Sequence, residues 1–294
     1  MAQWMNMSGV DGHGFSYIGR FNHEFGRVTG IAATIKGNIV LCDYDKKNLI
    51  LVDPLGNYLK NLNLDSEPYD VDITSQNIGY VTQPNSRSVL QIDPDNMMVL
   101  FQAKCSELGT TVFCVSAVPN TGRCFSKKVP CYLGVKTHGN LYAFPVNHDE
   151  INITDIEENG YEIGSCVLKF HTVNADSWLS CIGGQNYITY NEGFDYQIKI
   201  DNIATIDTPN DICSDDNDHI YVSGQGSNNI HRLIKYFKLQ VGSFETEADY
   251  TVLDIPLNSQ HGIKEPVALC FNQDYSKFYI VNEWGKSVLV FDVI

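Results

Sequence analysis

The sequence predicts an all-β fold, a six-bladed β-propeller with four antiparallel strands in each blade. The first observation is a repeat: short apolar segments separated by turn residues recur with a loose period of about 40–50 residues, which is typical of propeller blades. The second is that this unit can be followed through six copies. The third is that the last copy supplies only three strands, while strand-like residues 15–21 precede the first copy. We therefore expect residues 15–21 to complete the last blade and to remove the exposed edge of an open array.

The first copy, residues 28–64, illustrates the unit. It contains an apolar strand, a turn at Gly37 and Asn38, a second strand, a polar loop, a third strand, a Pro-Leu-Gly-Asn turn and a fourth strand. Hairpins favour these turn residues, and the strands between them alternate apolar and polar positions. Since no Pro-, Gly- or Ser-rich linker interrupts the series, we expect a single domain over residues 1–294. The expected blades cover residues 22–65, 66–103, 104–158, 159–203, 204–256 and 257–294.

Composition limits the classes of function. The chain has 35 acidic and 20 basic residues and a formal net charge of −15. Nucleic-acid binding depends on neutralising phosphates with Lys and Arg, so this balance argues against it. No apolar run approaches the roughly 18 residues of a membrane helix, and the first residues have neither the basic start nor the apolar stretch of a signal peptide. A protein or peptide is the expected partner, and no membrane contact is expected.

The nine cysteines form no CxxC pair, and most of them lie within apolar runs. An odd number without regular spacing fits buried free thiols better than a disulfide framework. Free thiols persist in reducing compartments. We therefore expect a cytoplasmic protein.

The repeat copies resemble the NHL repeat. Its Gly-Ile-Ala, Gly-Asn, strand-Asp and Asn-strand pattern is matched in the first copy by Gly30, Gly37, Asn38, Asp43, Asn48 and Asp53. Over essentially the whole chain, the sequence is similar to the C-terminal propeller of tripartite-motif (TRIM-NHL) ubiquitin ligases. That resemblance implies a domain that recruits protein substrates or RNA, while a separate RING domain carries ligase activity. It also implies structural roles for Asp43, which orders its loop, and for Gly37, which permits a turn.

The sequence contains no RING, B-box or coiled-coil segment and no zinc-ligand spacing. We therefore expect a non-enzymatic recognition module that holds no metal and no cofactor, the substrate-recognition part of a TRIM-NHL-like protein. RNA binding, as an NHL domain, is a weaker alternative because of the acidic composition.

Function in propellers usually resides in the loops, because the strands are committed to packing. The loops between second and third strands form a polar ring on one rim, and Tyr, Trp and Arg dominate interface hot spots. The alternative is that these loops are ordinary solvated turns. The candidate partner-binding residues are Tyr44, Lys46, Arg87, His138, Gln225, Asn228, Trp284 and Lys286.

An insertion in the third copy, residues 119–130, defines a second candidate surface. Loops of this length within compact domains are often functional. Arg123, Lys127 and Lys128 give it positive charge in an acidic chain, which suits an acidic partner. Because the insertion joins a first and a second strand, we expect it on the opposite rim.

A hydrolase is the enzymatic alternative. Calcium-dependent lactonases are six-bladed propellers with a metal in the channel, and Asp70 and the Asn210-Asp211 pair occupy positions that resemble two of its ligands. Calcium needs a cage of several oxygen ligands, and the Glu-Gly-Pro entry of the first copy is missing, since Thr29-Gly30 stands there. The segment from Asp215 to His219 lacks the Gly and the distant Glu of a calcium loop and is interpreted as a polar hairpin. No dinucleotide fingerprint, phosphate-binding loop or nucleophile elbow occurs.

Overall fold

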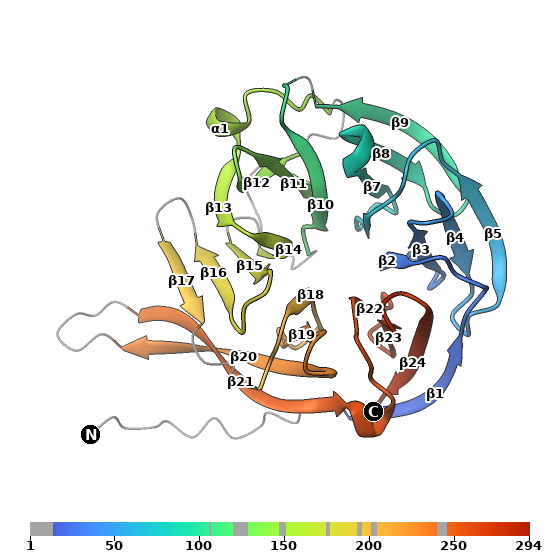
Figure 1. Cartoon of the computed structure of the whole chain (residues 1–294). Coiled ribbons are helices and arrows are strands. Elements are labelled where there is room, and N and C mark those ends of the chain that lie inside the picture. The colour runs from blue at the N-terminus through green and yellow to red at the C-terminus, as the bar shows by residue number, and fades with distance from the viewer. Residues whose placement is uncertain are drawn as a thin grey trace.

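The computed structural model confirms the all-β, six-bladed propeller. Six four-stranded antiparallel sheets are arranged in a ring (Figure 1). The structure describes residues 14–105, 107–119, 129–146, 151–174, 177–192, 196–200, 205–239 and 246–294.

Each blade runs outward from its first strand at the ring centre (Figure 1). The first blade comprises β2 (Val28–Ala33), β3 (Ile39–Asp43), β4 (Asn48–Val52) and β5 (Tyr58–Asn63). The second comprises β6 (Asp70–Ile73), β7 (Gly79–Gln83), β8 (Ser88–Asp93) and β9 (Met98–Lys104), with the short 3-10 helix η1 (Pro84–Ser86) after β7. The third comprises β10 (Thr111–Ala117), β11 (Cys131–Thr137), β12 (Asn140–Pro145) and β13 (Tyr161–Ser165), with the one-turn helix α1 (Ile156–Asn159) before β13.

The other three blades repeat this order. The fourth comprises β14 (Val167–Asn174), β15 (Ser177–Ile182), β16 (Ile188–Glu192) and β17 (Tyr196–Ile200). The fifth comprises β18 (Pro209–Ser214), β19 (Ile220–Gly224), β20 (Asn229–Leu239) and β21 (Thr246–Asn258), followed by the 3-10 helix η2 (Ser259–His261). The sixth comprises β22 (Ala268–Phe271), β23 (Lys277–Asn282), β24 (Ser287–Val293) and, as its outer strand, β1 (Phe15–Phe21).

The ring closes through the N-terminal strand, as the sequence predicts. β1 pairs antiparallel with β24 from Phe15 opposite Val293 to Phe21 opposite Val288. Beyond this pairing, Gly14 and Ile294 exchange two backbone hydrogen bonds of 2.9 and 3.0 Å. The outer edge of the last blade is therefore a paired strand from the other end of the described chain.

One blade boundary differs from the sequence expectation. β13 pairs with β12, so the third blade extends to Ser165 instead of ending at residue 158. In the fifth blade, residues 246–250 belong to the outer strand β21. β20 and β21 pair along their length as a hairpin that extends outward from the ring (Figure 1). Residues 241–245 lie outside the described residues.

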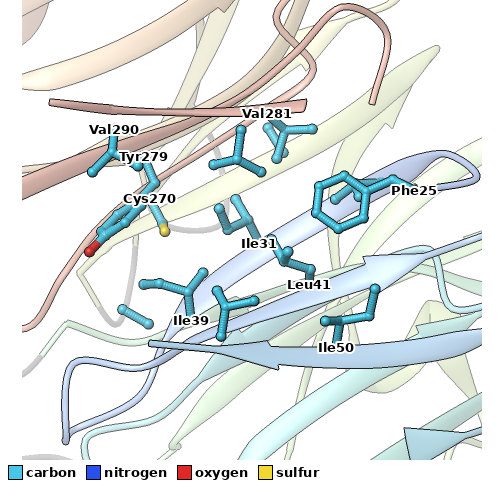
Figure 2. Close-up of a cluster of buried hydrophobic side chains, with 14 of the residues drawn as sticks. Phe25, Ile31, Ile39, Leu41, Ile50, Cys270, Tyr279, Val281 and Val290 are labelled. Carbon is cyan, nitrogen blue, oxygen red and sulfur yellow. The ribbon is translucent and has the colours of Figure 1, made fainter. Parts of the chain in front are cut away.

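The core lies between the blades. Both faces of a blade pack against neighbours, so inner strands are buried on both sides; all five residues of β3 are buried, for example. Within the described residues, six hydrophobic clusters each join a pair of adjacent blades. Figure 2 shows the cluster that joins the first and sixth blades, where Ile31 and Leu41 face Tyr279 and Val281. This arrangement leaves the edges of the first strands facing the ring centre.

Two turn residues have the roles expected from the repeat pattern. Gly37 adopts a φ of 82° in the turn between β2 and β3, a conformation that glycine tolerates without steric cost. The buried carboxylate of Asp43 accepts hydrogen bonds from the backbone N–H groups of Gly26 (3.0 Å), Arg27 (3.3 Å) and Lys46 (3.2 Å). It thereby fixes the loop after β3 to the chain that enters the blade.

The cysteines of the described residues carry free thiols, and six of these eight are buried. Cys124 lies outside those residues. In the part of the chain that the structure describes, no helix is both long and apolar enough to span a membrane. The cytoplasmic location stays a prediction.

Candidate functional site

The first strands of the six blades enclose a cavity of about 380 Å³ at the ring centre. Its lining includes Ser75, Pro119, Gln273 and Tyr275, which follow first strands. The cavity therefore reaches the face formed by the loops between first and second strands, which we call the 1–2 face. We call the cavity the channel pocket and the opposite face, with the loops between second and third strands, the 2–3 face.

An ion cluster lies in the channel pocket. The Lys169 ammonium on β14 is 3.0 Å from Asp70 Oδ1 on β6 and 3.5 Å from Asp211 Oδ1 on β18. It also donates a hydrogen bond of 3.3 Å to the carbonyl of Thr29 on β2. All three charged side chains are buried. One cation thus links four blades across the ring centre.

The carboxylates of the cluster are held by backbone groups of the next blade. Asp70 Oδ2 accepts the N–H of Val115 at 3.1 Å, and Asp211 Oδ2 accepts the N–H of Leu269 at 2.7 Å. Asp72 Oδ2 accepts the N–H of Ala117, on the same first strand as Val115, at 2.7 Å. Because a first strand has an unpaired edge at the ring centre, its N–H groups are free to bind these side chains. The sequence therefore places carboxylates where they satisfy strand edges.

Burial and charge set the protonation of the cluster. Burial raises the pKa of Asp211 to about 6, although the Lys169 ammonium opposes this rise. Burial also disfavours the charged form of Lys169, but the Asp211 and Asp70 carboxylates outweigh it and raise the pKa of Lys169 above its usual value. Lys169 is therefore positively charged at neutral pH, and its charge depends on the two carboxylates.

A second level of polar groups lies two residues further along the same strands. Burial raises the pKa of Asp72 on β6 to about 7, although its hydrogen bonds from Ala117 and Ile73 favour the carboxylate. Burial lowers the pKa of His171 on β14 to about 4, so that this imidazole is neutral at pH 7. Its Nε2 lies 3.0 Å from Ser214 Oγ and accepts the hydroxyl proton in the tautomer that carries its own proton on Nδ1. A proton acceptor and a carboxyl group that titrates near neutral pH thus line one cavity.

The thiols of the pocket do not add a nucleophile. Cys213 and Cys270 line the channel pocket, and burial raises the pKa of both well above the usual value. The thiolate is the reactive form of cysteine, so these side chains stay inert at neutral pH.

The arrangement of Asp70, Asn210 and Asp211 differs from the cage of oxygen ligands that the calcium alternative requires. The structure brings Asp70 and Asp211 together, but the Lys169 ammonium lies between them. Asn210 does not join them: its amide nitrogen donates to the carbonyl of Val267 at 3.1 Å. Within the described ranges, no group of three His, Cys, Asp or Glu side chains is placed to hold a metal ion. The site therefore uses an internal cation.

The segment from Asp215 to His219 forms the polar hairpin expected from the sequence. Asp215 Oδ1 accepts the backbone N–H groups of Asn217 and His219, both at 2.9 Å. Asp215 Oδ2 bonds to His219 Nδ1 at 2.9 Å and to the Tyr221 hydroxyl at 3.0 Å. The carboxylate is fully used inside the blade and offers no ligand to an ion.

All eight candidate rim residues lie in loops of the 2–3 face, but most of their polar groups are occupied within the chain. The Tyr44 ring lies under the Arg27 guanidinium at 4.5 Å, and the Arg87 guanidinium donates to the carbonyl of Glu107 at 3.1 Å. His138 Nδ1 is 3.0 Å from Glu157 Oε1. The ammonium groups of Lys46 and Lys286 donate to the carbonyls of Glu24 and Gly26. These contacts fasten the loops to the ring.

The remaining three rim candidates gather between the fifth and sixth blades. Gln225 and Asn228 line a groove of about 830 Å³, together with Gly226, Lys264 and Glu265 among others. Trp284 lies beside this groove, since its backbone N–H donates to the Glu265 carbonyl at 3.1 Å. The Trp284 side chain is exposed, at 49% of its surface. We call this feature the rim groove.

The second candidate surface is not described by the structure. Arg123, Lys127 and Lys128 lie outside the described residues. Its role stays a prediction.

Sequence reasoning missed Lys169, His171, Asp72 and Ser214. A signal for them exists in the repeat. Polar residues occur at two positions, two residues apart, in first strands that are otherwise apolar: Asp70 and Asp72, Lys169 and His171. The hydrogen bonds between blades place these pairs at corresponding levels, so aligning the first strands of the copies would have selected them.

Solved structures that resemble this one are six-bladed propellers. A catalytically inactive virginiamycin B lyase from Staphylococcus aureus, crystallised with quinupristin, matches 95% of this chain and 100% of its own with a TM-score of 0.63 and 12% identity. A protein of unknown function from Bacteroides thetaiotaomicron matches 97% of this chain and 73% of its own, with a TM-score of 0.65 and 12% identity. A gluconolactonase from Xanthomonas campestris matches 93% and 88%, with a TM-score of 0.63 and 8% identity. No protein-family model and no curated protein matches the chain. At these identities the likeness establishes the fold.

These matches correct the expectation that the chain is not an enzyme. Two of the three propellers are named as enzymes, a lyase and a gluconolactonase, and they match along almost the whole chain. A six-bladed propeller can thus itself be the catalytic unit, and the missing RING domain does not argue against activity. None of these three structures is named as a TRIM-NHL protein. Of the resemblance to that family, only the six-bladed propeller fold is confirmed.

Proposed function

We propose that the chain binds a small organic molecule in the channel pocket and catalyses proton transfer on it. The observation that carries this proposal is the presence of Asp72 and of the His171–Ser214 pair in one cavity that reaches the surface. Near pH 7, Asp72 is present in both protonation states and can donate a proton, while the neutral His171 can accept one. Such opposite tuning of two titratable groups is typical of acid–base catalysis.

The pocket also limits the substrate. Its volume of about 380 Å³ lies in the range of small-molecule sites. Asp70, Asp72 and Asp211 face a single ammonium there, so a neutral or cationic molecule is favoured over an anion. Ring-opening of a lactone is one reaction that needs both a proton acceptor and a proton donor, and the name of the gluconolactonase that shares the fold supports testing that class first.

The test is turnover of a defined panel by the purified chain: glucono-1,5-lactone, aliphatic lactones, aryl esters and quinupristin, followed by proton release and mass spectrometry. We expect turnover of at least one class and a loss of roughly 100-fold or more in His171→Gln and Asp72→Asn, the usual contribution of a general acid or base. Trp284→Ala, on the other face, serves as the matched control and should keep full activity. The proposal is wrong if the wild type turns over no member of the panel, or if both pocket variants remain as active as the wild type.

A second function is favoured by the rim groove: recognition of a protein or peptide, as part of a larger TRIM-NHL-like protein. The exposed indole of Trp284 beside a groove of about 830 Å³ supports it, because a large aromatic side chain at a hollow is typical of an interface hot spot. Trp284→Ala should then abolish partner capture without changing the melting temperature. Unchanged capture by this variant would exclude the rim groove as the binding surface.

A further inference from the structure

The charges around the rim groove identify the chemistry of its partner. Among the residues that the structure describes, three charged side chains border the groove. Lys264 and Glu265 line it and are both exposed. Asp207 Oδ1 accepts the hydroxyl of Thr208 at 3.0 Å, and its Oδ2 lies against Gly226, so that it borders two lining residues. The groove thus has two carboxylates and one ammonium.

The Glu265 carboxylate is available to a ligand. Within the described residues it forms no salt bridge, whereas the neighbouring Glu283 is paired with Arg20 at 2.5 Å. The backbone of Glu265 is fixed from two sides: its N–H donates to Asn228 Oδ1 at 2.7 Å, and its carbonyl accepts the N–H of Trp284. These backbone hydrogen bonds hold Glu265, whose carboxylate is unpaired, next to Trp284, whose indole is exposed, although the two residues lie on different loops.

An indole face and a carboxylate are complementary to a cationic side chain. The ring quadrupole of Trp attracts Arg and Lys, and a carboxylate accepts two parallel hydrogen bonds from a guanidinium. The net charge of −15 adds a long-range attraction for positive partners. The groove is open to solvent, so a peptide segment can enter it.

We infer that the rim groove binds an extended basic peptide segment of a partner protein, with an arginine placed between the Trp284 indole and the Glu265 carboxylate. This inference rests on the recognition function proposed above for the rim groove and is independent of the channel pocket. Lys264 at the same groove selects against a second cation next to the first one, so spaced arginines are favoured over a continuous basic run.

The experiment uses two synthetic peptides, acetyl-GRGRG-amide and its matched partner acetyl-GEGEG-amide, titrated into the full chain labelled with ¹⁵N. The readout is the indole N–H resonance of Trp284, assigned with Trp284→Phe. We expect saturable binding of the arginine peptide and no shift with the glutamate peptide. Glu265→Gln, followed at the same indole resonance, and Trp284→Ala, followed at the backbone amide resonances of the groove residues, should each weaken binding by roughly three- to tenfold, the size of a cation–π or exposed charge contact.

Glu158→Gln is the matched control, since Glu158 is an exposed carboxylate on α1, far along the ring from this groove in Figure 1. It should bind the arginine peptide as the wild type does. An equal loss in Glu158→Gln, or binding that does not depend on Glu265, would overturn the inference in favour of non-specific attraction. Binding of the glutamate peptide alone, with dependence on Trp284, would overturn the inference of a basic partner but would still support recognition at the rim groove. Binding of neither peptide at the Trp284 indole would reject both the basic partner and the recognition function of the rim groove.

Discussion

Replacing Lys169 with methionine removes the ammonium that lies between Asp70 and Asp211 at the ring centre. At an effective dielectric constant of about 20, unit charges 3.0 and 3.5 Å apart attract each other by roughly 5 kcal/mol per pair. The desolvation of all three ions offsets much of this attraction, and breaking a buried pair by removing one partner typically costs about 3–5 kcal/mol. For a chain of 294 residues, we expect the melting temperature of Lys169→Met to fall by roughly 5–10 °C.

The assay is thermal and urea unfolding of the wild type, of Lys169→Met and of a triple variant that also carries Asp70→Asn and Asp211→Asn. The triple variant should regain most of the lost stability, because it leaves no uncompensated charge at the ring centre. In Lys169→Met, Asp211 loses the ammonium that opposes the rise of its pKa by burial, so it binds its proton more tightly in the folded state, and the loss of stability should be larger at about pH 8 than at about pH 5. A Lys169→Met protein that melts like the wild type, or a triple variant less stable than the single one, would refute the reasoning.

Three further changes test other parts of the structure. Asp72 has a pKa of about 7 in the folded protein, above its unfolded value of about 4, so its contribution to stability is complete below about pH 4 and is lost as the pH rises to about 7. Asp72→Asn should flatten this pH dependence of the melting temperature across that range. An unchanged pH profile would contradict the assignment. Gly30→Ala would place a Cβ 2.9 Å from the Cα of Asp70 in the next blade and should cost about 1–3 kcal/mol in urea unfolding, while Gly19→Ala, where nothing lies within 4 Å, is the control that should change little. Asp43→Ala leaves three backbone N–H groups without their acceptor and should destabilise by about 2–4 kcal/mol; a loss no greater than that of an exposed Asp→Ala change would show that water replaces the carboxylate.

The fold could be predicted from the sequence because propeller blades depend on local signals. Turns such as Gly37-Asn38 mark hairpins, and the alternation of apolar residues gives the strands. Closure by residues 15–21 followed from counting the strands of the last copy. The boundary between the third and fourth blades was misplaced, because β13 is a short strand with few apolar residues that only its pairing with β12 reveals.

The candidate site was less accessible to sequence reasoning. Lys169 stands more than 40 residues from Asp211 and almost 100 from Asp70 along the chain, so no local motif joins them. Its strand, VLKFHTV, is otherwise ordinary, and the meaning of the lysine appears only when three blades meet at the ring centre. The rim residues lie on the loops that the sequence predicted. No sequence signal indicated that the side chains of Lys46, Arg87 and Lys286 would donate hydrogen bonds to backbone carbonyls of the same chain.

The two hydrogen bonds between Gly14 and Ile294 hold these residues side by side, so the ring is continuous there in hydrogen bonding although the backbone is not covalently joined. With residues 1–13 removed, a short linker between these two residues would yield a circular backbone, which could be reopened at exposed Asp65 between the first two blades. Such a permutant would keep every strand pairing, and loop cuts of this kind are commonly tolerated. Blades could then be supplied as two separately expressed halves, and their reassociation would report directly on how strongly the central ions draw the ring together.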